Sequence, residues 1–175
     1  GVIGLALGVA YFAPPVQLSA RGRGEIVVAI GYGVLPVTGA AFLQTETFSG
    51  QTVLVSLPIS FWISNVLLMN AVPDAEVDAR AGKRTMVVRF ELEGTQVVYL
   101  LVNASLVWAV AIAGSLSALP AAAMIAPVLL SSVALSAARV ILANADQELM
   151  RKRGIERTLL IHAAGSPCLM GWIWA

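Results

Sequence analysis

The run Val53-Leu-Val-Ser-Leu-Pro-Ile-Ser-Phe-Trp-Ile-Ser-Asn-Val-Leu-Leu-Met69 decides the fold class, because no charged side chain interrupts it. A helix needs roughly 20 mostly apolar residues to cross a bilayer, with a range of about 17–25. Of all 175 residues, 58% are apolar and 12% are charged. Soluble domains carry about 45–50% apolar and about 25% charged residues. The sequence therefore predicts an all-α integral membrane protein. Disorder is excluded, and with a net charge of +1 we expect no nucleic-acid partner.

Similar apolar runs lie on both sides of this one and predict a multi-helix transmembrane bundle with five full spans. The other four are Ile26–Leu43, Val97–Leu116, Ala118–Ala143 and Leu159–Trp174. Gly1–Phe12 is also apolar but only about half as long as a span needs to be. We expect it to be the end of a membrane helix. Residues 1–175 would then form a single transmembrane domain, the C-terminal part of a longer protein.

The distribution of positive charge predicts the topology. All eleven Lys and Arg residues lie in alternate connections, at 21–23, 80–89 and 139–157. The connections at 44–51 and 116–120 contain none. Because cytoplasmic loops of membrane proteins are enriched in Lys and Arg, we expect the three basic connections to be cytoplasmic. A location in the cell membrane, plasma or inner, is predicted.

One basic connection also carries a pattern of oxygen ligands: Asn70-Ala-Val-Pro-Asp74-Ala-Glu-Val-Asp78-Ala-Arg-Ala-Gly-Lys83-Arg84-Thr85. Residues four apart share a helix face, so Asp74 and Asp78 face the same side and Glu76 faces away. An all-oxygen set of this kind suits Mg²⁺, which is commonly bound by one or two carboxylates plus substrate phosphates. Gly82 is a plausible helix stop, followed by cations that could contact a phosphate.

Pro73 leaves two interpretations open, because an interior proline removes a helical hydrogen bond. Either one helix runs through, and Asn70 joins the two aspartates on its face, or the membrane helix ends near Asn70 and a second begins around Pro73. In both cases Asp74 and Asp78 share a face. A third possibility is that these charges form an ordinary solvated loop between two spans.

The segment Asn70-x-x-x-Asp74-x-x-x-Asp78, followed by Ala-Gly-Lys-Arg-Thr, resembles the second aspartate-rich motif of the UbiA superfamily of intramembrane prenyltransferases. The similarity is greatest to the 1,4-dihydroxy-2-naphthoate, or menaquinone-type, branch. Tyr11-Phe-Ala-Pro-Pro15 and Arg21-Gly-Arg-Gly-Glu25 resemble the family's loop between helices four and five. Phe42-Leu-Gln44-Thr45 also matches, and the resemblance covers roughly residues 5–92.

This resemblance implies a nine-helix bundle in which two aspartate-rich motifs hold Mg²⁺ on the diphosphate of a polyprenyl donor. The polyprenyl group would pass to an aromatic acceptor, both substrates being lipid-soluble and drawn from the membrane lipid. The first motif would belong before residue 1. The resemblance makes Asp74 and Asp78 the catalytic and metal-binding residues. It assigns diphosphate binding to Asn70, Lys83, Arg84, Tyr11, Arg21 and Arg23.

Two of these assignments depend on a departure from the family pattern. Tyr11 begins a Tyr-x-x-x-Lys pattern whose lysine position is occupied by Pro15, so Arg21 or Arg23 would replace that lysine. The alternative function is a transporter or a structural membrane subunit. A transporter is expected to place charged or unwound residues near the middle of the membrane. Here the carboxylates cluster at one surface, which favours the enzyme.

Overall fold

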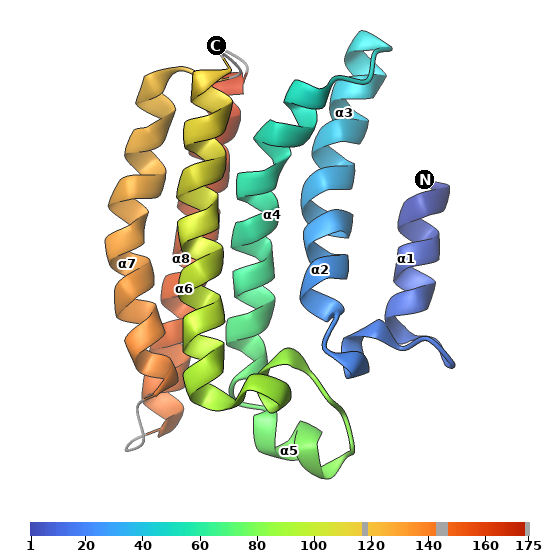
Figure 1. The fold of residues 1–175 in the computed structure, drawn as a ribbon, viewed down its shortest axis with the longest axis vertical. Helices are drawn as coiled ribbons and strands as arrows, with labels where there is room; N and C mark the ends of the chain where they lie inside the picture. The colour runs from blue at the N-terminus through green and yellow to red at the C-terminus, as the bar shows by residue number, and fades with distance from the viewer. Residues whose placement is uncertain (117–118, 143–146, 174–175) are drawn as a thin grey trace.

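The computed structural model describes residues 1–175 except 117–118, 143–146 and 174–175. Every regular element in the described part is helical, which confirms the predicted fold class (Figure 1). The order is α1 (Val2–Phe12), η1 (Leu18–Arg21), α2 (Gly24–Ala29), η2 (Ile30–Val34), α3 (Leu35–Thr45), α4 (Gly50–Ala71), α5 (Ala75–Arg80), α6 (Met86–Ser115), η3 (Ala121–Met124), α7 (Ile125–Ile141) and α8 (Gln147–Ile173).

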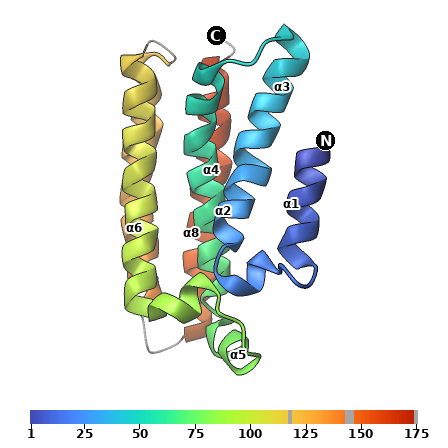
Figure 2. The ribbon, with the colours of Figure 1, turned by 45° about the vertical axis from the view of Figure 1, so that its right-hand side comes forward.

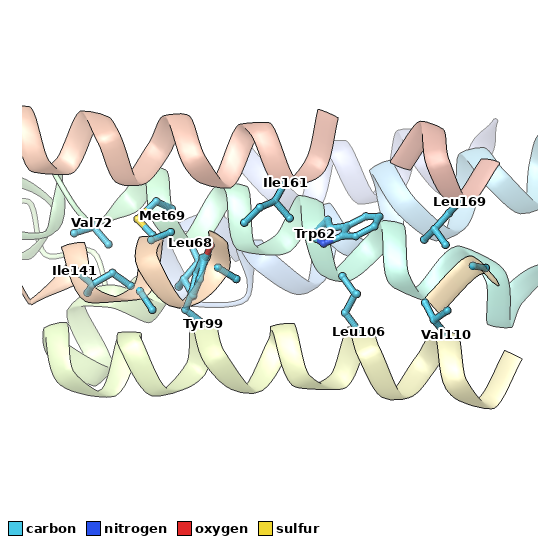
Figure 3. Packing of buried hydrophobic residues seen from close by; sticks show 14 of the residues in the cluster. Trp62, Leu68, Met69, Val72, Tyr99, Leu106, Val110, Ile141, Ile161 and Leu169 are labelled. Atoms are coloured by element: carbon cyan, nitrogen blue, oxygen red, sulfur yellow. The ribbon is translucent and has the colours of Figure 1, made fainter. Parts of the chain in front are cut away.

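Four long helices, α4, α6, α7 and α8, pack against one another and enclose the main core. Large buried side chains fill the space between them, and Figure 3 shows Trp62, Leu106 and Ile161 pointing into it. Tyr99 is fully buried there, and its hydroxyl hydrogen-bonds the Thr158 hydroxyl at 2.9 Å. The continuous rod α2–η2–α3 packs on α4, and α1 stands outermost (Figures 1 and 2).

Four segments of the described chain are long and apolar enough to cross a membrane: Gly24–Thr45, Gly50–Ala71, Met86–Ser115 and Ala121–Ile141. They contain the first four predicted spans except at the ends of two. The span predicted to end at Leu116 ends one residue earlier, with α6. For the span predicted at Ala118–Ala143, Leu142 follows α7, and Ala118 and Ala143 lie outside the described residues. The fifth predicted span, Leu159–Trp174, falls on α8. In its described part, α8 has no stretch that is apolar over a length sufficient to cross a membrane. Charged residues up to Arg157 occupy its first part and leave only a short apolar run behind them. Trp174, the predicted end of that run, is also outside the described residues.

The described parts of the three connections predicted to share one side of the membrane lie at one end of the bundle. The C-terminal ends of α1, α4 and α7 point to the same end, where α5 also lies (Figure 1). The connection between α3 and α4, which has no Lys or Arg, lies at the opposite end. Of the connections that the structure describes, those with Lys or Arg and the one without them therefore lie at two ends of one bundle.

The segment after α4 follows the second of the two interpretations that Pro73 left open. The helix ends at Ala71, a turn follows, and α5 begins at Ala75 with Asp74 as its N-cap residue. Proline lacks the N–H that a continuing helix would need, so the helix is interrupted here. Gly82, with φ of +74°, ends α5 in a Schellman motif: Lys83 N donates to Asp78 O, and Gly82 N to Ala79 O.

Candidate functional site

A cavity of about 240 Å³ lies at the end of the bundle where α4 meets α5. It gathers side chains from five separate parts of the chain: the end of α1, η1, the start of α2, the α4–α5 segment and the loop before α6. Its lining residues are Tyr11, Ser19, Ala20, Gly24, Glu25, Leu67, Asn70, Ala71, Asp74, Asp78, Lys83 and Thr85. Five of the eight predicted site residues are therefore together: Tyr11, Asn70, Asp74, Asp78 and Lys83.

The two aspartates border this cavity from the beginning of α5. Asp78 N donates to Asp74 O at 2.8 Å, which is the first helical hydrogen bond of α5. Asp74 is exposed, whereas the Asp78 side chain is 13% exposed. Glu76, as predicted from its spacing, is exposed and does not line the cavity. The short helix thus presents two carboxylates to one space.

Lys83 closes one side of the site by pairing with Asp78. Its Nζ donates to Asp78 Oδ1 at 2.6 Å, and the Schellman turn at Gly82 brings it back over α5. This hydrogen bond and the charge of Asp78, with a smaller contribution from Asp74, raise the pKa of Lys83 above its ordinary value. Lys83 is therefore a fixed cation beside two carboxylates at neutral pH.

The three predicted arginines do not line the cavity. Arg21 Nη2 donates to Pro15 O at 2.6 Å, and Arg23 is exposed at the start of α2. Arg84 is also exposed, and its backbone N donates to Ala20 O at 2.8 Å, which joins the loop before α6 to η1. A diphosphate-binding role for these arginines stays a prediction.

Sequence reasoning missed Glu25, which it treated only as the boundary of an apolar run and as part of a family motif. In the structure Glu25 is only 6% exposed and lines the cavity. The preceding Gly24 packs against the Tyr11 ring: a Cβ there would lie 3.4 Å from Cε2 and 3.6 Å from the hydroxyl. A carboxylate placed directly before an apolar run was the available signal.

Two apolar cavities adjoin the polar one. The first, about 310 Å³, lies between α2, η2, α4 and α6 and shares Glu25 with the polar cavity. The second, about 420 Å³, lies between α1 and the α2–η2 segment and shares Tyr11. The site therefore combines a carboxylate- and lysine-bearing space at the end of the bundle with apolar spaces that extend into its membrane-length part.

The donor set fits a magnesium ion that also binds a phosphate ligand. Asp74 and Asp78 offer carboxylate oxygens, and Asn70, at the same cavity, offers an amide oxygen. Among the described residues no group of three or more His, Cys, Asp and Glu side chains could hold a metal ion. Mg²⁺ does not require such a group, because one or two carboxylates, waters and substrate phosphates commonly complete its octahedron.

Three curated proteins are similar to parts of this chain. The 1,4-dihydroxy-2-naphthoate octaprenyltransferase of Bacillus subtilis is 30% identical over 88 residues, 50% of this chain and 28% of that protein. The protein of the same name from Haemophilus influenzae is 32% identical over 89 residues, 51% of this chain and 29% of that protein. The 2-carboxy-1,4-naphthoquinone phytyltransferase of Synechocystis is 32% identical over 104 residues, 58% of this chain and 34% of that protein.

These matches span about a third of the length of the relatives or less. No solved structure matches the chain significantly. The profile of the UbiA prenyltransferase family matches residues 1–161, which is most of the sequence and includes all the residues that line the polar cavity. The chain belongs to the UbiA prenyltransferase family.

Proposed function

We propose that the full-length protein transfers a polyprenyl group from a polyprenyl diphosphate to an aromatic acceptor, and that this chain supplies the second aspartate-rich motif. The observation that carries the proposal is the cavity itself, which brings Asn70, Asp74, Asp78 and Lys83 together next to apolar space. Family membership supports the reaction class. The names of the relatives support a naphthoate-type acceptor, as in menaquinone biosynthesis.

In this scheme Asp74 and Asp78 hold Mg²⁺, with the amide oxygen of Asn70 nearby. Bound Mg²⁺ supplies stabilisation of the negative charge that develops on the diphosphate as it leaves. Lys83 adds a fixed positive charge at the same place, because its pairing with Asp78 keeps the ammonium beside the metal-binding carboxylates. The chain's own residues therefore bind the donor by its charged end.

The apolar cavities would hold the lipid-soluble parts of the two substrates. A polyprenyl chain and an aromatic ring are both lipid-soluble, and each needs apolar surroundings next to the diphosphate site. An apolar, water-poor space also protects an allylic cation from reaction with water. The basic connections lie at the same end of the bundle as the cavity, so we place this end on the cytoplasmic side of the cell membrane.

The test is prenyl transfer by the full-length protein in membranes. The protein is incubated with Mg²⁺, a polyprenyl diphosphate and either 1,4-dihydroxy-2-naphthoate or 4-hydroxybenzoate, and lipid-soluble product is measured. We expect product with the naphthoate, its loss on chelation of divalent ions, and its return when Mg²⁺ is restored. Absence of product from every aromatic acceptor, with the protein intact in the membrane, would overturn the proposal.

A further inference from the structure

Glu25 is the carboxylate shared by the polar cavity and the apolar cavity between α2, η2, α4 and α6. It lines the 240 Å³ cavity together with Asp74, Asp78 and Lys83. It also lines the 310 Å³ cavity, whose other walls include Ile26, Ile30, Phe61 and Leu68. None of the aspartates borders this second cavity. Glu25 therefore stands where the charged part of the site changes into the apolar part.

Burial of this carboxylate calls for an explanation. It is 6% exposed, and the one ion pair found among the described residues joins Lys83 to Asp78, not to Glu25. Glu25 is in the first turn of α2, where the helix dipole favours a carboxylate, but burial without a cationic partner still costs free energy that an exposed first-turn carboxylate would not. Ionisable groups within membrane-spanning segments are accordingly functional by default.

The proposed reaction has its reacting atoms at the same boundary. The diphosphate of the donor lies with Asp74, Asp78 and Lys83, and the polyprenyl chain requires apolar surroundings. With the chain in the 310 Å³ cavity, the carbon that joins the two would lie between that cavity and the polar one, where Glu25 is. The attacking ring carbon of the acceptor has to come within about 3–3.5 Å of that carbon, which brings a neighbouring ring hydroxyl close to Glu25.

We propose that the Glu25 carboxylate is the base that accepts the hydroxyl proton of the aromatic acceptor; this rests on the proposed prenyl transfer. The carbon–oxygen bond of the allylic diphosphate breaks, and the diphosphate takes the electron pair. A pair from the ring forms the new carbon–carbon bond, and the hydroxyl proton moves to Glu25. The attacked carbon then loses a proton, or CO₂ where it bears a carboxylate, and the bonding pair left behind makes the ring aromatic again. The oxygen takes back the proton held by Glu25, which restores the carboxylate.

The assignment divides the work between two sets of carboxylates. Asp74 and Asp78 lie beside Lys83 and would hold the metal and, through it, the diphosphate leaving group. Glu25 lies on α2, away from that pair in the sequence, and acts on the acceptor. Loss of Glu25 should therefore slow turnover with little effect on donor binding, whereas loss of an aspartate should weaken both.

The experiment compares wild-type full-length protein with Glu25→Gln and Glu25→Asp, and uses Glu93→Gln, an exposed glutamate on α6, as the matched control. Each variant is assayed with acceptors that differ in the acidity of the ring hydroxyl. General bases contribute about 10²–10⁴-fold, so we expect Glu25→Gln to lower kcat about 100-fold or more with an unchanged KM for the donor. The loss should shrink with the more acidic acceptors, and Glu25→Asp should retain more activity than Glu25→Gln. Glu93→Gln should match the wild type.

Two results would overturn the assignment while leaving the proposed function intact. One is wild-type turnover by Glu25→Gln. The other is an equal loss with every acceptor whatever its hydroxyl acidity, since a structural role has no such dependence. If Glu25→Gln does not accumulate in the membrane, the same series of acceptors, assayed with Glu25→Asp, distinguishes a base from a structural role for Glu25. Failure of the wild-type protein to transfer a prenyl group to any acceptor is a different outcome, which contradicts the proposed function itself.

Discussion

At the scale of single residues, Asp74 and Asp78 should be far more sensitive to substitution than Glu76, although all three are carboxylates within five positions of one another. Asp74 and Asp78 line the cavity, and Glu76 points to solvent. We expect Asp74→Ala or Asp78→Ala to lower prenyl transfer by the full-length protein about 100-fold or more, since charge stabilisation of the leaving group is lost. Glu76→Ala should stay close to wild type. Initial rates at equal membrane levels measure this, and equal losses at all three positions would contradict the ligand assignment.

Lys83 offers a second test at this scale because the sequence contains just one other lysine, Lys152, which is exposed on α8. Acylating reagents attack the neutral amine. The hydrogen bond to Asp78 raises the pKa of Lys83, so at any given alkaline pH a smaller fraction of its amine is neutral. We expect Lys83 to be acylated more slowly in wild-type protein than in Asp78→Asn, as followed by mass spectrometry of the peptide that contains it. Labelling of Lys152 should be the same in both proteins, and an unchanged rate at Lys83 would mean that the ion pair does not form.

At the scale of elements, α4 shows how far an apolar run determines a helix. The run Val53–Met69 predicted it to within a few residues of its bounds, Gly50–Ala71. Its start is set by Ser49, whose Oγ accepts from Gln51 N at 3.1 Å, and its end precedes Pro73. Capping and proline are local effects, so they can be recognised in the sequence. The same local reasoning predicted that Gly82 would end α5.

α6 and Glu25 show where that reasoning fails. The run beginning at Val97 missed eleven residues of α6, which starts at Met86 behind the Thr85 cap. This early part is charged, and at Glu91 the backbone takes φ of +55° before the membrane-length part begins. Glu25 was missed as a site residue because its burial arises from the approach of distant elements. Five of the predicted site residues were nevertheless brought together, four of them from one short segment and Tyr11 from α1.

The contact between η2 and α4 gives a prediction with a matched control two residues away. Gly33 lies so close to Ser60 that a Cβ at that position would overlap the serine side chain and backbone, whereas a Cβ at Gly31 would meet nothing within 4 Å. Overpacking of a tight contact costs about 1–3 kcal/mol. Gly33→Ala should therefore lower the free energy of unfolding by about that amount, and Gly31→Ala should not lower it. Unfolding in mixed detergent micelles measures the difference. Equal stability of the two variants would show that the helices do not approach this closely.

At the scale of the whole molecule, the two ends of the bundle should be accessible from opposite sides of the membrane. Ala81 follows α5 at the end that carries the basic connections, and Ser49 lies at the other end, between α3 and α4 (Figure 1). After Cys168, the one cysteine of the sequence, is replaced by serine, single cysteines are introduced at Ala81 and Ser49. A membrane-impermeant thiol reagent should label Ser49→Cys in intact cells, and Ala81→Cys only after the membrane has been permeabilised. Labelling of both from one side would contradict the topology.

The last prediction concerns what residues 1–175 can do by themselves if, as proposed, they are part of a longer protein. In the proposed function they supply one of two aspartate-rich motifs, and their matches cover about a third of the relatives or less. Asp74 and Asp78 line the cavity beside Lys83, and among the described residues no group of three or more His, Cys, Asp and Glu side chains could hold a metal ion. Mg²⁺ gives up its water reluctantly and would be held weakly by this half-site.

Because Asn70, Asp74 and Lys83 at this cavity are exposed, water could also reach an allylic cation formed in it. We therefore expect no detectable prenyl transfer by the isolated 175-residue chain, and transfer by the full-length protein, when both are assayed in lipid with Mg²⁺, a polyprenyl diphosphate and an aromatic acceptor. Comparable product from the isolated chain would mean that the half-site built on Asp74 and Asp78 suffices, and that a second motif has no part in holding the metal.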